Sequence, residues 1–250
     1  MADFHIENST LTDLPFTGAE ELYVYQYIHV RDLSPVGLAD HMAVAAAVAR
    51  DAFGIGFSPD LRLTDSLCRQ MLIRNRWPQD VSSCIEMRLC ASGAVHFLCG
   101  EIFTHNGLTL RTIRPDAVSL CYDIPFGEAP TSVRRAAAAM ASAEARRRGA
   151  RAAVRCNAQG LVMTADDSPL FAAFGRRIVT PQTLPSVERD RVARAASRAG
   201  YALAEEPLER ESLRRADELF YSDCRGITAL SSCDGRTYAD IIARAIAAQM

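Results

Sequence analysis

The sequence predicts an α/β (α+β) fold in two parts: a small N-terminal α+β domain and a larger C-terminal domain with helices on a mixed sheet. Strand and helix signals alternate along the 250 residues, and the segment "DIPFGEAP" after Tyr122 places two prolines and a glycine within eight residues. The expected boundaries are 1–121 for the first domain, 122–130 for the linker and 131–250 for the second domain. With 49% apolar residues, the chain can bury a core in each part.

The first elements are a strand and two helices. Residues 21–30 ("ELYVYQYIHV") are β-branched and aromatic with alternating apolar positions, which predicts a strand. The alanine-rich run 38–53 predicts a helix that Gly54 stops. A second helix is expected from an N-cap at Thr64 or Asp65 to about residue 76, before a proline.

Shorter apolar runs follow between residues 83 and 113, with turn signals at Ser92-Gly93 and Asn106-Gly107. Asn-Gly is the stronger hairpin signal because it tolerates the positive backbone angles of a tight turn. These runs predict a small antiparallel sheet on which the two helices pack.

The C-terminal part begins with a helix capped by Thr131 or Ser132 and stopped by Gly149. The expected later elements alternate between strands and helices. They are two strands around a turn at 157–160, the strand "RRIVTP", a helix at 186–199, the strand "YALAEEPLE", a short helix "RESLRRADE", the strand "LFYSDC" and a final amphipathic helix at 238–249.

Composition excludes several classes of protein. A net charge of −2 argues against a nucleic-acid surface, because neutralising phosphates needs clustered positive charge. No stretch approaches the ~20 apolar residues of a membrane span, and no leader-like segment opens the chain, so a cytoplasmic protein without membrane contact is expected. The eight cysteines form no CxxC pair and are expected to be reduced and mostly buried.

The order of landmarks resembles the class IV aminotransferases, the fold-type IV pyridoxal phosphate (PLP) family that includes branched-chain and D-amino-acid aminotransferases and aminodeoxychorismate lyase. "ADELFYSD" resembles the family's "ADEVF" stretch, "RRIVTP" its "TPp" strand, and "TLPSVERDRVARAASRAGY" its "LpGITR" helix. "YVYQYIHVRDLSPVGLADHMAVAAAVARDAFGI" is similar to the family's N-terminal stretch. The resemblance implies a larger domain with a pseudo-barrel sheet, a homodimer and a cofactor cleft.

The same resemblance shows where the chain departs from the family at its functional positions. No lysine occurs among the 250 residues, and the family's Schiff-base lysine falls near Thr131. An arginine cannot replace it, because a guanidinium stays protonated and has no free lone pair to attack an aldehyde. The glutamate that pairs with the pyridine nitrogen falls at Thr164, the asparagine that follows falls at Pro169, and the arginine of the N-terminal stretch falls at Val44.

The family's phosphate cup is altered as well. Its "GIT" helix start corresponds to Ser186, Val187 and Glu188, and its "sGT" turn to Ser222, Asp223 and Cys224. Backbone amides at a helix start attract anions whatever the side chains. Glu188 and Asp223, however, place carboxylates where a phosphate would sit, and Arg189 and Arg225 are expected to pair with them. No cofactor is therefore expected.

Other constellations give weaker signals. Arg88 lies on the strand where the family often places an arginine that faces a substrate carboxylate, so either acid binding or a surface or interdomain salt bridge is expected of it. Asp166 and Asp167 fall in a predicted loop and are expected to be turn formers. Cys224 is expected to be a passive thiol, and His96 and His105 lack a nearby carboxylate at metal-ligand spacing.

These observations lead to three hypotheses of function. The first is a homodimeric pseudoenzyme of this family, without catalytic or metal-binding residues, whose cleft is empty or holds a small acid. The second is a lysine-independent enzyme that uses Cys224 or the Asp166 and Asp167 pair on an amino-acid-like substrate. The third is a structural or interaction dimer.

Overall fold

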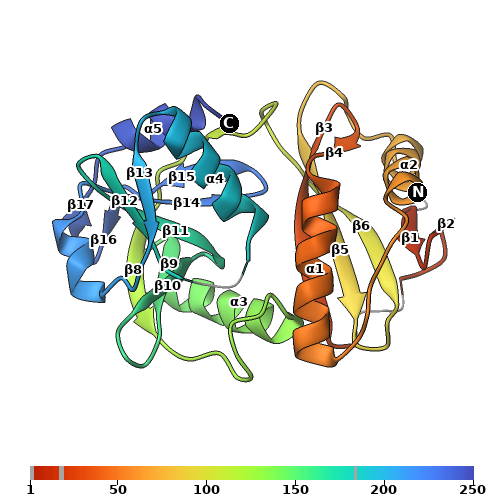
Figure 1. The fold of residues 1–250 in the computed structure, drawn as a ribbon, viewed down its shortest axis with the longest axis horizontal. Coiled ribbons are helices and arrows are strands. Elements are labelled where there is room, and N and C mark those ends of the chain that lie inside the picture. The colour runs from red at the N-terminus through yellow and green to blue at the C-terminus, as the bar shows by residue number, and fades with distance from the viewer. Residues whose placement is uncertain (1–2, 17–19, 183–184) are drawn as a thin grey trace. The chain divides into compact units, whose positions relative to one another are not determined.

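The computed structural model describes residues 3–16, 20–182 and 185–250, and the chain divides into two compact units (Figure 1). The first unit runs to Gly107 and includes Ala129–Ser132, and the second holds Leu108–Glu128 and Val133–Met250. The sequence places the end of the first part at residue 121 instead. The strands that follow Gly107 account for the difference, because they pair only with strands of the second unit.

The first unit contains a six-stranded antiparallel sheet in the order β2-β1-β6-β5-β3-β4. Its strands are β1 (His5–Glu7), β2 (Thr10–Thr12), β3 (Tyr23–Arg31), β4 (Ser34–Pro35), β5 (Ser83–Cys90) and β6 (Val95–Ile102). The predicted antiparallel sheet and the turn at Ser92-Gly93 between β5 and β6 are confirmed. β1 and β2 were not predicted, because three-residue strands carry too little pattern.

The hairpin expected at Asn106-Gly107 does not form. The Ser82 hydroxyl donates to Asn106 Oδ1 at 3.1 Å and accepts from the Gly107 amide at 2.8 Å, so this segment folds back onto the residue before β5. The next strand, β7 (Thr109–Leu110), pairs with β15 of the second unit.

Two helices, α1 (Leu38–Phe53) and α2 (Leu61–Arg74), pack on this sheet. The bounds of α1 are those predicted, and Gly54 ends it with a left-handed φ of 69°. α2 begins one turn earlier than expected, because Asp60 and not Thr64 is the N-cap. The Asp60 carboxylate accepts from the amides of Arg62 and Leu63.

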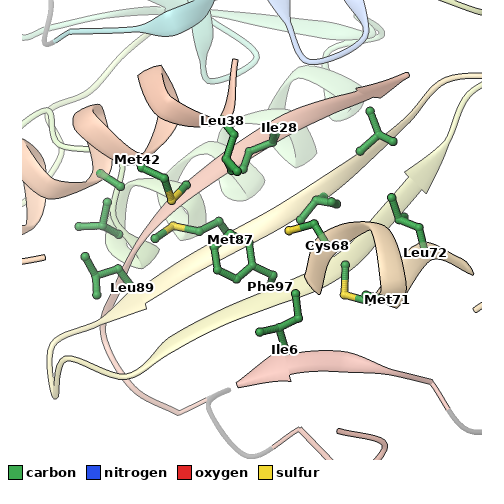
Figure 2. Close-up of a cluster of buried hydrophobic side chains, with 14 of the residues drawn as sticks. Ile6, Ile28, Leu38, Met42, Cys68, Met71, Leu72, Met87, Leu89 and Phe97 are labelled. Atoms are coloured by element: carbon green, nitrogen blue, oxygen red, sulfur yellow. The ribbon is translucent and has the colours of Figure 1, made fainter. Parts of the chain in front are cut away.

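The core of the first unit lies between these helices and the sheet (Figure 2). Met42 of α1 and Met71 of α2 are both almost fully buried, as are Ile28 and Met87 from the sheet. Along β5, Ile85, Met87 and Leu89 alternate with Glu86 and Arg88, so this sheet has one apolar face and one polar face.

The second unit is built on an eleven-stranded mixed sheet, on which β17-β16-β8-β9-β10-β11-β14-β15-β7 form a path, with β12 and β13 attached at β11. After β7, the strands are β8 (Asp116–Cys121), β9 (Ala152–Cys156), β10 (Val162–Ala165), β11 (Ser168–Phe174), β12 (Arg177–Thr180), β13 (Ala202–Glu205), β14 (Glu218–Asp223), β15 (Gly226–Ala229), β16 (Ser232–Cys233) and β17 (Arg236–Thr237). The pairs β8–β9, β12–β13, β15–β7 and β16–β8 are parallel. The predicted mixed sheet with helices is confirmed.

The helices of this unit are α3 (Ser132–Arg147), α4 (Val187–Arg198), α5 (Ile241–Ala247) and the 3₁₀ helix η1 (Arg210–Arg215). α4 and α5 pack on one face of β11, β14 and β15, where Phe171 and Phe220 stack with ring centroids 5.1 Å apart. A second core on the other face includes Leu170 and Tyr221. None of the helices in the described residues is long and apolar enough to cross a membrane.

The predicted loop at Thr164–Pro169 is a two-residue turn. β10 ends at Ala165 and β11 begins at Ser168, and the intervening Asp166 and Asp167 have φ values of 43° and 65°. Two positive φ values in succession are typical of a type I′ hairpin turn, which aspartate tolerates better than most residues. The expectation that both aspartates form a turn is confirmed, whereas β11 was not predicted.

Candidate active site

The sequence-predicted site residues are divided between the units. Thr164 lies on β10; Ser186, Val187 and Glu188 lie at the start of α4; Ser222 and Asp223 end β14, and Cys224 follows them. Arg88, on β5, and Thr131, which bridges to Val24, belong to the first unit.

Strand register brings the tip of the β10–β11 hairpin beside the end of β14. Leu170 pairs with Tyr221 in antiparallel register, so continuing the register places Ser168 opposite Asp223. Asp166, at the hairpin tip, accepts a hydrogen bond of 3.4 Å from the Tyr221 hydroxyl and one of 2.9 Å from the Ala153 amide. Burial raises the pKa of the Asp166 carboxyl, and it raises the pKa of Tyr221 to about 12.

The start of α4 is closed by its own side chains. Ser186 is the N-cap: its hydroxyl accepts from the Arg189 amide at 3.3 Å and donates to Glu188 Oε2 at 2.9 Å. Burial raises the pKa of Glu188, and the nearby Asp223 raises it further. Val187 is buried. Glu188 and Asp190 lie in the first turn, as the sequence predicts.

One of the two predicted arginine–acid pairs is present. Arg225 donates from its amide and its guanidinium to Asp223, including an Nε–Oδ2 hydrogen bond of 2.9 Å. Arg189 was expected to pair with Glu188, and that prediction is wrong: its Nε lies 3.5 Å from Glu205 Oε1. The side chain of Arg189 is buried, and it reaches Glu205 on β13 and not the carboxylate at the helix start.

Behind the hairpin lies a cavity of about 10 Å³, lined in part by Thr164 and by the two aspartates of the turn. This volume holds about one water molecule. Asp167 is tied to Arg134 of α3 through an Nε–Oδ1 contact of 2.5 Å, and Arg155 pairs with Glu128. Thr164, at the position of the family's glutamate, is one of the residues that line this small cavity.

The remaining predicted residues of the second unit are also buried. Ser222 has an exposed fraction of 0%, and its hydroxyl has no hydrogen-bond partner in the described residues. Cys224 is buried, with Arg225 as its neighbour.

In the first unit, Arg88 forms an internal ion pair. Its Nε lies 2.6 Å from Glu86 Oε1, and its guanidinium stacks on the rings of Tyr23 and Phe16. The sequence predicts either acid binding or a surface or interdomain salt bridge for Arg88, and the ion pair observed is of neither salt-bridge kind, because it is largely buried and joins two residues of β5. Thr131 leads into α3, and the neighbouring Ser132 hydroxyl accepts from the Tyr23 amide.

The residues that the sequence did not single out are Tyr221, Arg155 and Glu128. Tyr221 lies on β14, and its sequence neighbours give no sign of a functional role. Its proximity to Asp166 follows from the pairing of β11 with β14. Arg155 and Glu128 lie 27 residues apart and meet through tertiary structure alone. Among the described residues, no group of three histidine, cysteine or acidic side chains is arranged to hold a metal ion.

The fold and these site elements define a protein of the fold-type IV class. The family model for amino-transferase class IV matches residues 24–233, so the chain belongs to that family. No curated protein matches the sequence significantly.

Similar solved structures cover nearly the whole chain at low sequence identity. The branched-chain aminotransferase of Thermoproteus uzoniensis with norvaline has a TM-score of 0.82 at 18% identity, over 98% of this chain and 93% of that one. A hypothetical aminotransferase of Mycobacterium tuberculosis, bound to alpha-ketoglutarate and PMP, gives 0.81 at 15%, over 98% of each chain. An aminotransferase of Brucella abortus bound to PLP gives 0.76 at 19%, over 97% and 95%.

The expectation of no cofactor is contradicted by these comparisons. Structures with the same fold hold PLP or PMP, so the class to which the chain belongs is a cofactor-binding one. The residues of this chain do not fit the covalent form of that cofactor, because no lysine is present. At the α4 start, the partly buried Glu188 carboxyl also takes a hydrogen bond beside the amides that bind phosphate in the family.

Proposed function

We propose that this protein is a pseudoenzyme of the class IV aminotransferase family, unable to carry out transamination through a Schiff base. The observation that carries the proposal is the absence of lysine from all 250 residues. Arginine cannot supply the missing amine at any pH at which the protein is folded. Any PLP or PMP bound by this chain is then held non-covalently.

The arrangement of the second unit supports this proposal. In the family, a glutamate supports the pyridine ring and a threonine of the "sGT" turn helps to hold the phosphate; here Thr164 and Cys224 stand at those positions, and Glu188 at the helix start accepts a hydrogen bond from Ser186. Arg225 is a cation close to this helix start that could bind a phosphate. Its guanidinium already forms an ion pair with Asp223. The fold is retained, while the groups that position a reacting cofactor are replaced.

Sodium borohydride trapping tests the proposal directly. Borohydride reduces an imine to a stable amine, and in a lysine-free chain only the N-terminal α-amine can form an imine with PLP. We expect reduced adduct at the N-terminal α-amine alone. The variant Thr131→Lys restores an amine near the family position, and Arg50→Lys, at an exposed site on α1, is its matched control. A stoichiometric adduct elsewhere in the unmodified chain would overturn the proposal.

A small acid as the ligand of the pseudoenzyme rests on Arg88. Because Arg88 is bonded to Glu86 and stacked on two rings, an acid would have to displace an existing carboxylate. The ion pair thus favours a pseudoenzyme whose Arg88 stabilises the first unit over one that uses Arg88 to bind ligand.

The second candidate is a lysine-independent enzyme, and one observation favours it. Asp166, Tyr221, Asp223 and Arg225 are clustered, and burial raises the pKa of Asp166 and of Tyr221. Clusters of groups with perturbed pKa values are typical of acid–base sites. Asp167 is committed to Arg134, so an acid–base role falls on Asp166. A protein-dependent reaction that Asp166→Asn abolishes and Asp167→Asn does not would favour this candidate.

We also propose that the protein is a homodimer. The proposal rests on the resemblance to a dimeric family and on the matching fold along 97–98% of the chain. Exposed apolar side chains support it: Phe126 and Ile241 are both more than two thirds exposed in the single chain.

A further inference from the structure

The end of strand β8 brings an exposed thiol and a buried thiol together. In the parallel register of β8 and β9, Cys121 and Cys156 are direct partners. Neighbouring strands lie about 4.7–4.9 Å apart, which is within the ~4.4–6.8 Å Cα separation that a disulfide needs. Both residues are free thiols. Register partners on neighbouring strands point to the same face of the sheet, so the two thiols lie on one side of it.

The two thiols differ in access to solvent. Cys156 has an exposed fraction of 0%, whereas Cys121 is exposed. Cys121 lines an open groove of about 750 Å³ together with Tyr122 and the α3 residues Ala137 and Met140. A groove of this volume accommodates a molecule the size of a small peptide. A dissolved reagent therefore meets Cys121 first and reaches Cys156 only through it.

A third thiol and an arginine complete the surroundings. Cys233, on β16, is buried close enough to Cys156 for their charges to interact, and burial raises the pKa of both thiols to about 12. Arg210 lines the same groove and favours the thiolate of Cys156. The buried Cys156 and Cys233 are thus protected from direct oxidation, and exchange starts at the exposed Cys121.

We propose that Cys121 and Cys156 form a thiol–disulfide exchange pair that small disulfides modify through the α3 groove. The Cys121 thiolate attacks one sulfur of the small disulfide, the sulfur–sulfur bond breaks, and one thiol leaves with a proton. The Cys156 thiolate then attacks the Cys121 sulfur and expels the second thiol. Two protein thiols are oxidised to one disulfide, and the small disulfide is reduced to two thiols. The pair is independent of the cofactor site.

Peptide mapping of the unmodified protein after treatment with oxidised glutathione tests the proposal. In this lysine-free chain, trypsin cuts only after arginine, which places Cys121, Cys156 and Cys233 alone on the peptides 112–134, 156–176 and 226–236. After free thiols are blocked with iodoacetamide, we expect 112–134 linked to 156–176, and loss of the link on reduction. A link from 156–176 to 226–236, or a stable glutathione adduct on Cys121 without any link, would overturn the proposal.

Variants separate the roles of the thiols. Cys156→Ala should stop the reaction at a stable glutathione adduct on Cys121, and Cys121→Ser should leave Cys156 unmodified. Cys233→Ala is the matched control. It removes a buried thiol of the same cluster whose register partner is Ala117 and not Cys121 or Cys156. It should leave the link between Cys121 and Cys156 intact. Loss of the link in this control, with the fold retained by circular dichroism, would assign exchange to Cys233.

Discussion

At the scale of single residues, the adjacent Asp166 and Asp167 have opposite surroundings. Both lie in one turn with positive φ, which asparagine also tolerates. Asp167 forms an ion pair with Arg134. Asp166 is buried beside Tyr221, and this burial raises its pKa, so its charged form is disfavoured in the folded state.

Replacing these aspartates should shift stability in opposite directions. A raised folded-state pKa means that the folded protein binds the Asp166 proton more tightly than the unfolded chain does. Its contribution is therefore largest below the unfolded pKa and is lost as the pH rises through the folded pKa. Asp166→Asn should raise the free energy of unfolding at pH 7 and flatten its decline with pH. Asp167→Asn should lower it by roughly 1.5–3 kcal/mol, because the hydrogen bonds of a charged pair are lost.

Urea unfolding of both variants at pH 5 and pH 7 measures these shifts. If Asp166→Asn lost as much stability as Asp167→Asn at pH 7, Asp166 would be a stabilised carboxylate, and the acid–base candidate for this site would lose its support.

At the scale of elements, the N-terminus of α4 is the part of the second unit where we expect anion affinity to be set. A helix N-terminus attracts negative charge, and here Glu188 supplies it from within the helix while Ser186 caps the first turn. The site is thus neutralised internally, with Asp223 and its partner Arg225 close by.

Opening this helix start should restore anion binding. We expect Glu188→Thr combined with Ser186→Gly to raise sulfate affinity several-fold. The partly buried carboxylate of Glu188 then no longer lies beside the backbone amides of the first turn of α4. Asp190→Asn is the matched control, since Asp190 is an exposed acid in the same turn. Isothermal titration calorimetry measures the sulfate affinity of the double variant and of the control. Tight sulfate binding by the unmodified protein would contradict internal neutralisation.

The helices and strands also show which parts of the fold the sequence predicts. α1 and α4 were predicted to within a residue or two because alanine-rich runs with a clear stop or N-cap carry their bounds locally. β11 was not predicted, because Ser168 and Pro169 were assigned to a loop, although Pro169 pairs with Thr164 at the start of that strand. The site residues came from the resemblance, whereas their partners did not. Glu205 reaches Arg189, and Glu128 reaches Arg155, through contacts that no local pattern encodes.

At the scale of the whole molecule, the chain keeps both units of its family and the residues that match it from 24 to 233. The family's fold is thus present in a chain that has no lysine. Packing surfaces are the feature that such a protein can still use, and apolar side chains such as Phe126 lie fully exposed on the single chain.

The dimer proposal predicts a mass of twice 27.3 kDa in solution. Twofold pairs are the commonest assembly of soluble proteins and bury such exposed groups in a shared interface. Light scattering coupled to size exclusion, at micromolar concentration, measures the mass. A single-chain mass that persists on concentration would count against the dimer.

The central claim, loss of Schiff-base transamination, is tested most directly by turnover. Purified protein is supplied with PLP, an amino acid and a 2-oxo acid, and amino-group transfer is compared with the same mixture without protein and with a class IV aminotransferase that has its lysine. The account predicts transfer no faster than that of free PLP, because the chain has no side-chain amine to carry the reaction. Saturable, protein-dependent transfer that scales with the concentration of this chain would contradict it.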